Sequence, residues 1–157
     1  MQNEMLEMTA KEYLLQVRRK EAVIKRLKCD KKNLREILFS LGANAGEGDK
    51  VQTSFNNDRY GSIFAKIDEK DCLITKKLED LIDFKVQVSD EISMLSDPKY
   101  IDILHKRYIQ FRSFEQIAVD MGYSYRYVTK IHGYALLEFE KVMYKNGRNM
   151  KMCTNDL

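Results

Sequence analysis

The sequence has little of what turns a chain sharply. Its 157 residues include one proline, seven glycines and no tryptophan, whereas 32% of them are charged. Such a composition suits long, exposed helices better than a compact mixed fold. We therefore expect an all-α protein that forms one ordinary domain or two small ones.

Residues that carry chemistry are equally scarce. His105 and His132 are the only two histidines, and neither has a cysteine or carboxylate at ligand spacing on a shared face. That pattern argues against a zinc site and against a nucleophile with its base. Cys29, Cys72 and Cys153 are odd in number and widely spaced, which predicts free thiols. The sequence thus predicts no enzyme, with no catalytic residues, cofactor or metal.

Long apolar runs are also missing. No stretch approaches the roughly 20 residues that cross a membrane. The N-terminus lacks the basic and apolar blocks of a signal peptide. The net charge of +3 is mild, so an argument for nucleic acid must rest on where the basic residues lie. We expect a cytoplasmic protein with no membrane partner.

The first long helix is expected over residues 10–41. Thr9 and Glu12 have the spacing of a capping box, and no later residue in this stretch breaks a helix. Its apolar residues recur with a period near 3.5, typical of coiled-coil packing, at Tyr13, Val17, Ile24, Leu27, Leu34, Leu38 and Leu41. Its many basic residues also allow a DNA-gripping helix, although a solvated or partner-matched face is their usual meaning.

A second long helix is expected over residues 62–95, after a loop over residues 42–61 that contains four glycines. The loop lacks the GKS or GKT ending of a phosphate-binding loop. The second helix is acidic where the first is basic, and its apolar residues recur every seven positions, at Ile67, Ile74, Leu81, Val88 and Leu95. We therefore expect the two helices to pair as a long antiparallel, coiled-coil-like helical hairpin.

Apolar residues beside this row, at Phe64, Leu78 and Ile92, leave surface that one antiparallel partner cannot cover. A second hairpin would cover it as a four-helix bundle, which favours a homodimer. The alternative is a monomer in which the stripe packs on the chain's own C-terminal module.

The C-terminal module begins at Asp97 and Pro98, a cap followed by a first helical residue, and its first helix should reach about Gln110. The next stretch predicts two helices joined by a short turn. Ser113 and Gln116 can form a capping box, Gly122 suits the turn, and Ser124 can cap again. Inward apolar positions follow at Ile117, Ala118, Met121, Val128, Ile131, Ala135 and Phe139. This order indicates a helix-turn-helix rather than an ordinary helical hairpin.

In a helix-turn-helix, the first turns of the second helix contact base edges and phosphates in the major groove. Arg can bond guanine with two parallel bonds, and Lys neutralises phosphate. An exposed Tyr can bond a phosphate or pack on the preceding helix, and we expect His132 to be a polar surface residue. The candidate DNA-binding residues are Arg112, Ser113, Ser124, Tyr125, Arg126, Tyr127, Thr129, Lys130 and His132.

The same residues carry a family resemblance. The stretch DPKYIDILHKRYIQFRSFEQIAVDMGYSYRYVTKIHGYALLEFEKV resembles region four of sigma-70-type factors, in the form found in phage and prophage transcription regulators of the ArpU and RinA groups. The front half, with TAKEYLLQVRR and GDKVQTS, is similar to an uncharacterised phage family with this tail. The resemblance implies DNA binding in phage gene control within a bacterial host cell. No counterpart of sigma region two is visible, so a complete sigma factor is not implied.

The sequence therefore predicts a hairpin over residues 1–96, a helix-turn-helix domain over 97–145 and a tail over 146–157. Its expected function is a DNA-binding transcription regulator, with double-stranded DNA and, as a possibility left open, RNA polymerase as partners. One alternative is a DNA-packaging adaptor resembling a small terminase subunit. Another is a protein-interaction module that binds RNA polymerase or a host factor.

Overall fold

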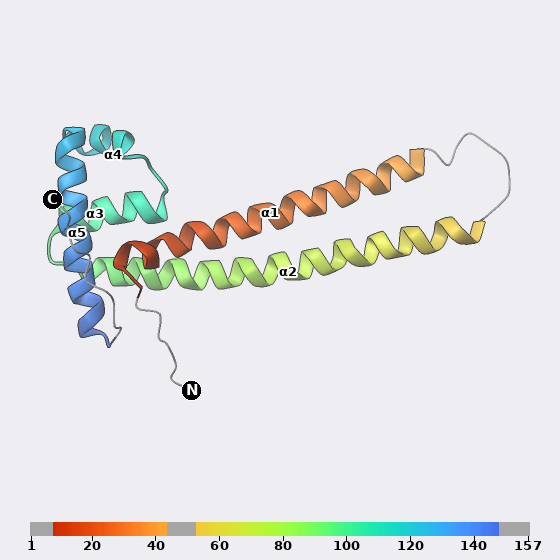
Figure 1. Ribbon diagram of the computed structural model, residues 1–157, viewed down its shortest axis with the longest axis horizontal. Helices are drawn as coiled ribbons and strands as arrows, with labels where there is room; N and C mark the ends of the chain where they lie inside the picture. Colours follow the sequence, from red (N-terminus) through yellow and green to blue (C-terminus); the bar gives the residue numbers. More distant parts are fainter. Residues whose placement is uncertain (1–7, 44–52, 148–157) are drawn as a thin grey trace. The chain divides into compact units, whose positions relative to one another are not determined.

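The computed structural model describes residues 8–43 and 53–147, without the side chains of residues 43 and 53–57. The regular elements of these described residues are all helices (Figure 1). They are α1 (Ala10–Ala43), α2 (Thr53–Ser93), α3 (Pro98–Leu104), the π-helical segment η2 (His105–Ile109), α4 (Phe114–Met121) and α5 (Tyr125–Lys145). The all-α prediction is confirmed for this part of the chain. None of these helices combines the length and apolar character needed to cross a bilayer.

Local hydrogen bonds set where the first and third helices begin. The amide of Thr9 donates to Glu12 Oε2 at 2.9 Å, and the amide of Glu12 donates to Thr9 Oγ1 at 3.2 Å. This is the predicted capping box of α1. The carboxylate of Asp97 accepts from the amide of Lys99 at 2.8 Å, with Pro98 at the start of α3. Both predicted helix starts are confirmed.

The predicted start of the second helix at Ser62 was wrong. Helix α2 begins at Thr53, so Gly61 lies inside it and the expected loop over 42–61 is shorter at its second end. A glycine in a helix costs only about 1 kcal/mol relative to alanine, which neighbouring turns can offset. Residues 44–52 of that loop, the tail after Gly147 and Cys153 lie outside the described residues.

Contacts divide the chain into two compact units. Unit 1 comprises Met1–Arg19 and Ile82–Leu157, and unit 2 is Lys20–Leu81. The start of α1 and the end of α2 therefore belong with the C-terminal helices. This grouping differs from the sequence-based division at residues 96 and 97.

In unit 2, residues 20–43 of α1 and 53–81 of α2 run antiparallel (Figure 1). Two neighbouring ion pairs link them, Lys31 with Asp71, and Lys70 with Asp30 at 3.6 Å. The buried side chains are Ile24, Ile63, Ile67, Ile74 and Leu81. The predicted apolar row of α2 is thus buried here, whereas the row of α1 is only half-buried beyond Ile24.

Unit 1 has the larger core, to which α3 and α5 contribute a closely packed pair. Its fully buried side chains include Leu14, Val17, Val88, Ile92, Ile103, Leu104, Ile117, Val128, Phe139 and Met143. Residues from both ends of the chain therefore share one core.

Tyr13 joins these segments through its ring and its hydroxyl. The ring stacks on Phe139 at 6.3 Å and meets Phe84 edge-on at 5.4 Å. The hydroxyl donates to the buried carboxylate of Glu91 at 2.8 Å and accepts from Gln87 Nε2 at 2.9 Å. Gln87 Nε2 also lies 3.1 Å from the other oxygen of Glu91. The buried carboxyl group of Glu91 therefore has hydrogen-bond partners on α1 and on its own helix.

The end of η2 is shaped by an unusual backbone. Phe111 has a φ of 57°, in the left-handed region that a bulky residue seldom adopts. The ammonium of Lys85 lies 5.1 Å from the centre of its ring. This cation–π contact holds the strained residue against α2.

Replacing Tyr13 with Phe removes one donor from a buried carboxylate while keeping the ring. We expect Tyr13→Phe to lower the free energy of unfolding by about 1–2 kcal/mol. Urea unfolding followed by circular dichroism measures the loss. Tyr144→Phe is the matched control at an exposed site and should change stability by less than about 0.5 kcal/mol. Equal effects of the two substitutions would show that the Tyr13 hydroxyl contributes nothing.

Candidate nucleic-acid interface

Helices α4 and α5 are joined by a turn of three residues whose conformation is set locally. Ser113 Oγ accepts from the amide of Gln116 at 3.3 Å, and Gln116 Oε1 accepts from the amide of Ser113 at 2.9 Å. Gly122 ends α4 with a φ of 67°, where an L side chain would be strained. Ser124 Oγ then caps α5 by accepting from the amide of Tyr127 at 3.2 Å. Both caps and the glycine turn occur where the sequence predicted them.

Burial fixes which side of α5 faces outward. Its buried residues are Val128, Ile131, Ala135, Leu136, Phe139, Glu140 and Met143. The residues of α4 buried in the same core are Ile117 and Ala118. The predicted inward positions of α5 are therefore confirmed, as are Ile117 and Ala118, whereas Met121 is only half-buried. The exposed residues of α5 are left free for other contacts.

The exposed side of α5 is basic and aromatic. We call Arg126, Tyr127, Lys130, Tyr134 and Lys141 the α5 outer face. Arg126 and Lys130 lie one turn apart, and neither forms an ion pair with another described residue. The sequence has no acidic residue from Met121 to Leu137. This surface offers cations and hydrogen-bond donors, which suits a polyanionic partner.

The side chains around Arg126 and Lys130 are ordered by short-range contacts. The ammonium of Lys130 lies 5.9 Å from the ring centre of Tyr134. Thr129 Oγ1 donates to the carbonyl of Arg126 at 2.9 Å, so its hydroxyl is used within the helix. The candidate residues predicted from the sequence did not include Tyr134 or Lys141. Tyr134 could have been found, because it lies four residues after Lys130 on the same helical face.

Tyr125 and Tyr127 combine the two roles that the sequence left open. The ring of Tyr125 meets Phe114 edge-on at 6.3 Å, and the ring of Tyr127 meets Tyr123 edge-on at 5.0 Å. Both side chains nevertheless remain exposed, at 51% and 41%. Each ring is therefore positioned by packing, while part of each side chain remains open to solvent.

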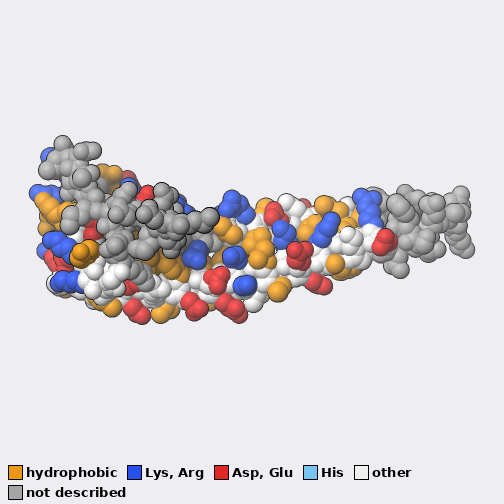
Figure 2. Space-filling model, turned by 60° about the horizontal axis from the view of Figure 1, so that its bottom comes forward, with side chains coloured by type: hydrophobic (Ala, Val, Ile, Leu, Met, Phe, Trp, Pro, Cys, Tyr) orange, Lys and Arg blue, Asp and Glu red, His pale blue; other side chains and the backbone are white. Residues whose placement is uncertain are grey.

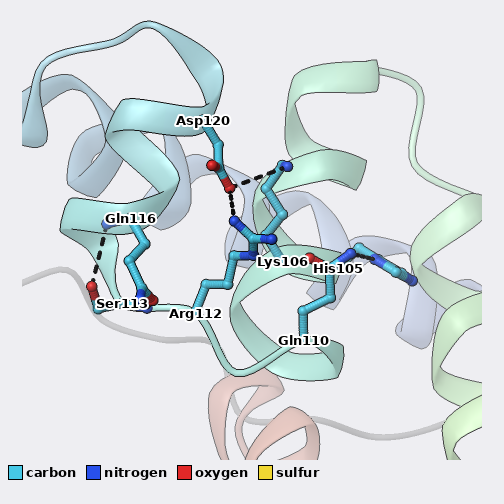
Figure 3. A network of polar contacts seen from close by, with 7 residues as sticks. All are labelled: His105, Lys106, Gln110, Arg112, Ser113, Gln116 and Asp120. Atoms are coloured by element: carbon cyan, nitrogen blue, oxygen red, sulfur yellow. Dashed lines mark hydrogen bonds and ion pairs between the residues drawn. The ribbon is translucent and has the colours of Figure 1, made fainter.

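Arg112 is neutralised within the chain (Figure 3). Its guanidinium pairs with Asp120 Oδ2, which also lies 3.6 Å from Lys106 Nζ. Arg107 Nη1 donates to the carbonyl of Arg112 at 2.9 Å, and its guanidinium lies 4.4 Å from the ring centre of Phe114. These contacts hold the loop before α4 in place. The side chains of Arg112 and Ser113 therefore have partners within the chain, whereas the guanidinium of Arg126 forms no ion pair with another described residue.

His132 does not lie on the outer face, and the prediction of a surface position was wrong. Its ring stacks on Tyr108 at 5.7 Å and meets Phe114 edge-on at 5.0 Å. Its Nε2 lies 3.0 Å from the hydroxyl of Tyr108. The physical reason is helical spacing, because residue 132 lies four positions after buried Val128. Burial, followed by the charges of Arg107 and Lys11, lowers the pKa of His132 to about 4.

This low pKa predicts a loss of stability in acid. The unfolded chain binds a proton to His132 at an ordinary pKa near 6.5, whereas the folded chain binds it only near 4. The stability that the folded chain owes to a neutral His132 is therefore fully present above pH 6.5. It is lost as the pH falls toward 4. We expect unfolding to cost about 2 kcal/mol less at pH 5 than at pH 8 from this residue alone.

Urea unfolding across pH, compared with His132→Gln, measures the effect. Glutamine cannot be protonated, so the variant should show a smaller loss in acid. His105→Gln is the matched control and should keep the loss, because His132 is still present. An identical pH dependence in wild type and His132→Gln would contradict the assignment.

No protein-family model, curated protein or solved structure matches the chain.

Proposed function

We propose that α4 and α5 form a helix-turn-helix that binds double-stranded DNA, with the first turns of α5 in the major groove. The observation that carries this proposal is the α5 outer face, where Arg126 and Lys130 have no acidic partner among the described residues and lie next to a turn that is capped on both sides. A buried stripe opposite this face holds the helix in the unit. Such an exposed, preorganised cationic helix end is what groove binding requires.

The proposed contacts follow from the chemistry of each side chain. Arg126 bonds the O6 and N7 atoms of guanine, and Lys130 neutralises a backbone phosphate. Tyr125 and Tyr127 donate to phosphates through hydroxyls whose rings are fixed by packing. Arg112 has a secondary role, because a phosphate would have to compete with Asp120 for its guanidinium.

Transcription regulation of the phage type is the biological role that fits this proposal best. It rests on the similarity of residues 97–142 to region four of sigma-70-type factors, including the stretch YSYRYVTKIHGYAL. The proposed setting is the cytoplasm of a bacterial host cell, and RNA polymerase is a candidate second partner. A DNA-packaging adaptor would use the same groove contact.

One observation favours a protein partner instead. Val119, in the middle of α4, is 82% exposed, although a branched apolar side chain gains nothing from water. It could contact RNA polymerase or a host factor. Such a partner is compatible with DNA binding by α5, and becomes the leading function only if the chain binds no duplex.

The groove contact predicts different effects for its two basic residues. Selection from a random duplex library with the full chain supplies the binding sequence, and fluorescence anisotropy then measures affinity across salt concentrations. Arg126→Ala should cost about 1–3 kcal/mol on the selected sequence and relax base preference. Lys130→Ala should weaken binding to all sequences and reduce the salt dependence, because it removes a phosphate contact.

Lys66→Ala is the matched control, since it removes one exposed positive charge from α2. It should leave affinity and base preference unchanged. Circular dichroism checks that each variant is folded. If both Arg126→Ala and Lys130→Ala bind duplex DNA as tightly as the wild type, α5 does not bind in the major groove.

A further inference from the structure

Unit 2 leaves much of its apolar surface uncovered. Beyond Ile24, none of the described apolar side chains of α1 is buried, and Phe39 is 80% exposed. On α2, Phe64 is 53% exposed. Long helices gain most of their stability from packing an apolar face, and the described part of unit 2 buries little of its own.

A groove also lies wholly within unit 2, with Leu78 half-buried beside the buried Ile24 and Leu81. It has a volume of about 270 Å³ and is lined by Glu21, Ile24, Lys25, Lys28, Leu78 and Leu81. Its floor is therefore aliphatic, and its charged residues come from α1. Figure 2 shows hydrophobic side chains at the surface between charges of both signs along the paired helices. A partner for this groove must supply an apolar ridge flanked by carboxylates.

Unit 2 itself carries that complement. Residues 20–43 contain seven Lys or Arg and three acidic residues, whereas residues 53–81 contain six acidic and five basic residues. Lys25 and Lys28 form no ion pair with another described residue, and neither does Glu79, next to the groove residue Leu78. The basic helix and the more acidic helix thus each leave charges unmatched.

We propose that unit 2 is a self-association surface on which a second copy of this chain packs its own unit 2. The helix α1 of one copy lies beside α2 of the other, so that the groove is filled and unlike charges face each other. A two-fold arrangement satisfies both grooves at once, because the same patch serves on both copies. The opposite pairing, α1 beside α1, would bring two basic helices together. This inference does not depend on DNA binding.

The first test measures mass by light scattering on the full chain without DNA. The wild type should have twice the 18.5 kDa mass of one chain. Leu78→Glu places a charge in the groove and should give a monomer, with helicity checked by circular dichroism. Leu73→Glu makes the same change on the same helix outside the groove, and should remain a dimer.

The second test examines the arrangement of the helices. One variant combines Lys25→Glu with Lys28→Glu, and the other combines Glu79→Lys with Asp80→Lys. Each variant alone should associate at least tenfold more weakly than wild type, because like charges face each other. A mixture of the two should recover a dimer, because each altered helix then meets its opposite charge.

Every other outcome overturns the proposal. A wild-type monomer shows that the groove is not a self-association surface, and a larger ring contradicts the two-copy assembly. Equal effects of Leu78→Glu and Leu73→Glu remove the groove as the interface. A mixture that stays monomeric contradicts α1 beside α2. None of these results bears on DNA affinity measured by fluorescence anisotropy. The proposals of self-association and of DNA binding can therefore fail separately.

Discussion

The burial of one face of α5 is the constraint on which the C-terminal structure depends. Phe139 and Met143 anchor one end of the helix in the core of unit 1, and Val128 and Ile131 anchor the other. With that stripe fixed, the direction of every other side chain on the helix follows from its spacing of 3.6 residues per turn. Arg126 and Lys130 are held outward for this reason, and His132 is held inward for the same one.

The two units are stabilised in different ways. Unit 1 uses aromatic and aliphatic packing among segments from both ends of the chain, and its buried Glu91 is supplied with hydrogen bonds. Unit 2 has a thin apolar seam and ion pairs such as Lys31 with Asp71. Partly exposed ion pairs contribute little to folding. A unit built in this way gains stability by binding a partner, which is the physical basis for proposing that it self-associates.

The sequence was most informative where structure is set by neighbouring residues. The capping boxes at Thr9 and Ser113 and the turn at Gly122 depend on side chains within a few positions, so they were predictable. The grouping of Tyr13 with Phe139 was not, because it depends on contacts between distant segments. Gly61 gave a misleading helix boundary, since one glycine is a weak signal against a long helix.

The candidate site was predictable to the same extent. The buried stripe of α5 identified the outward positions of Arg126 and Lys130, but the pairing of Arg112 with Asp120 needed the three-dimensional structure. His132 was misplaced because its polarity was given more weight than its position next to the stripe. Polar residues that stack on aromatic rings, as His132 does on Tyr108, cannot be identified from polarity alone.

Methylation interference is the direct test of whether α5 binds DNA in the major groove. Methyl groups placed on guanine N7 project into that groove, whereas a drug that fills the minor groove leaves N7 open. We expect guanine methylation within the selected site to abolish binding of the full chain, and a minor-groove drug to leave binding intact. Binding that is unaffected by N7 methylation but lost to the minor-groove drug would contradict major-groove binding by α5.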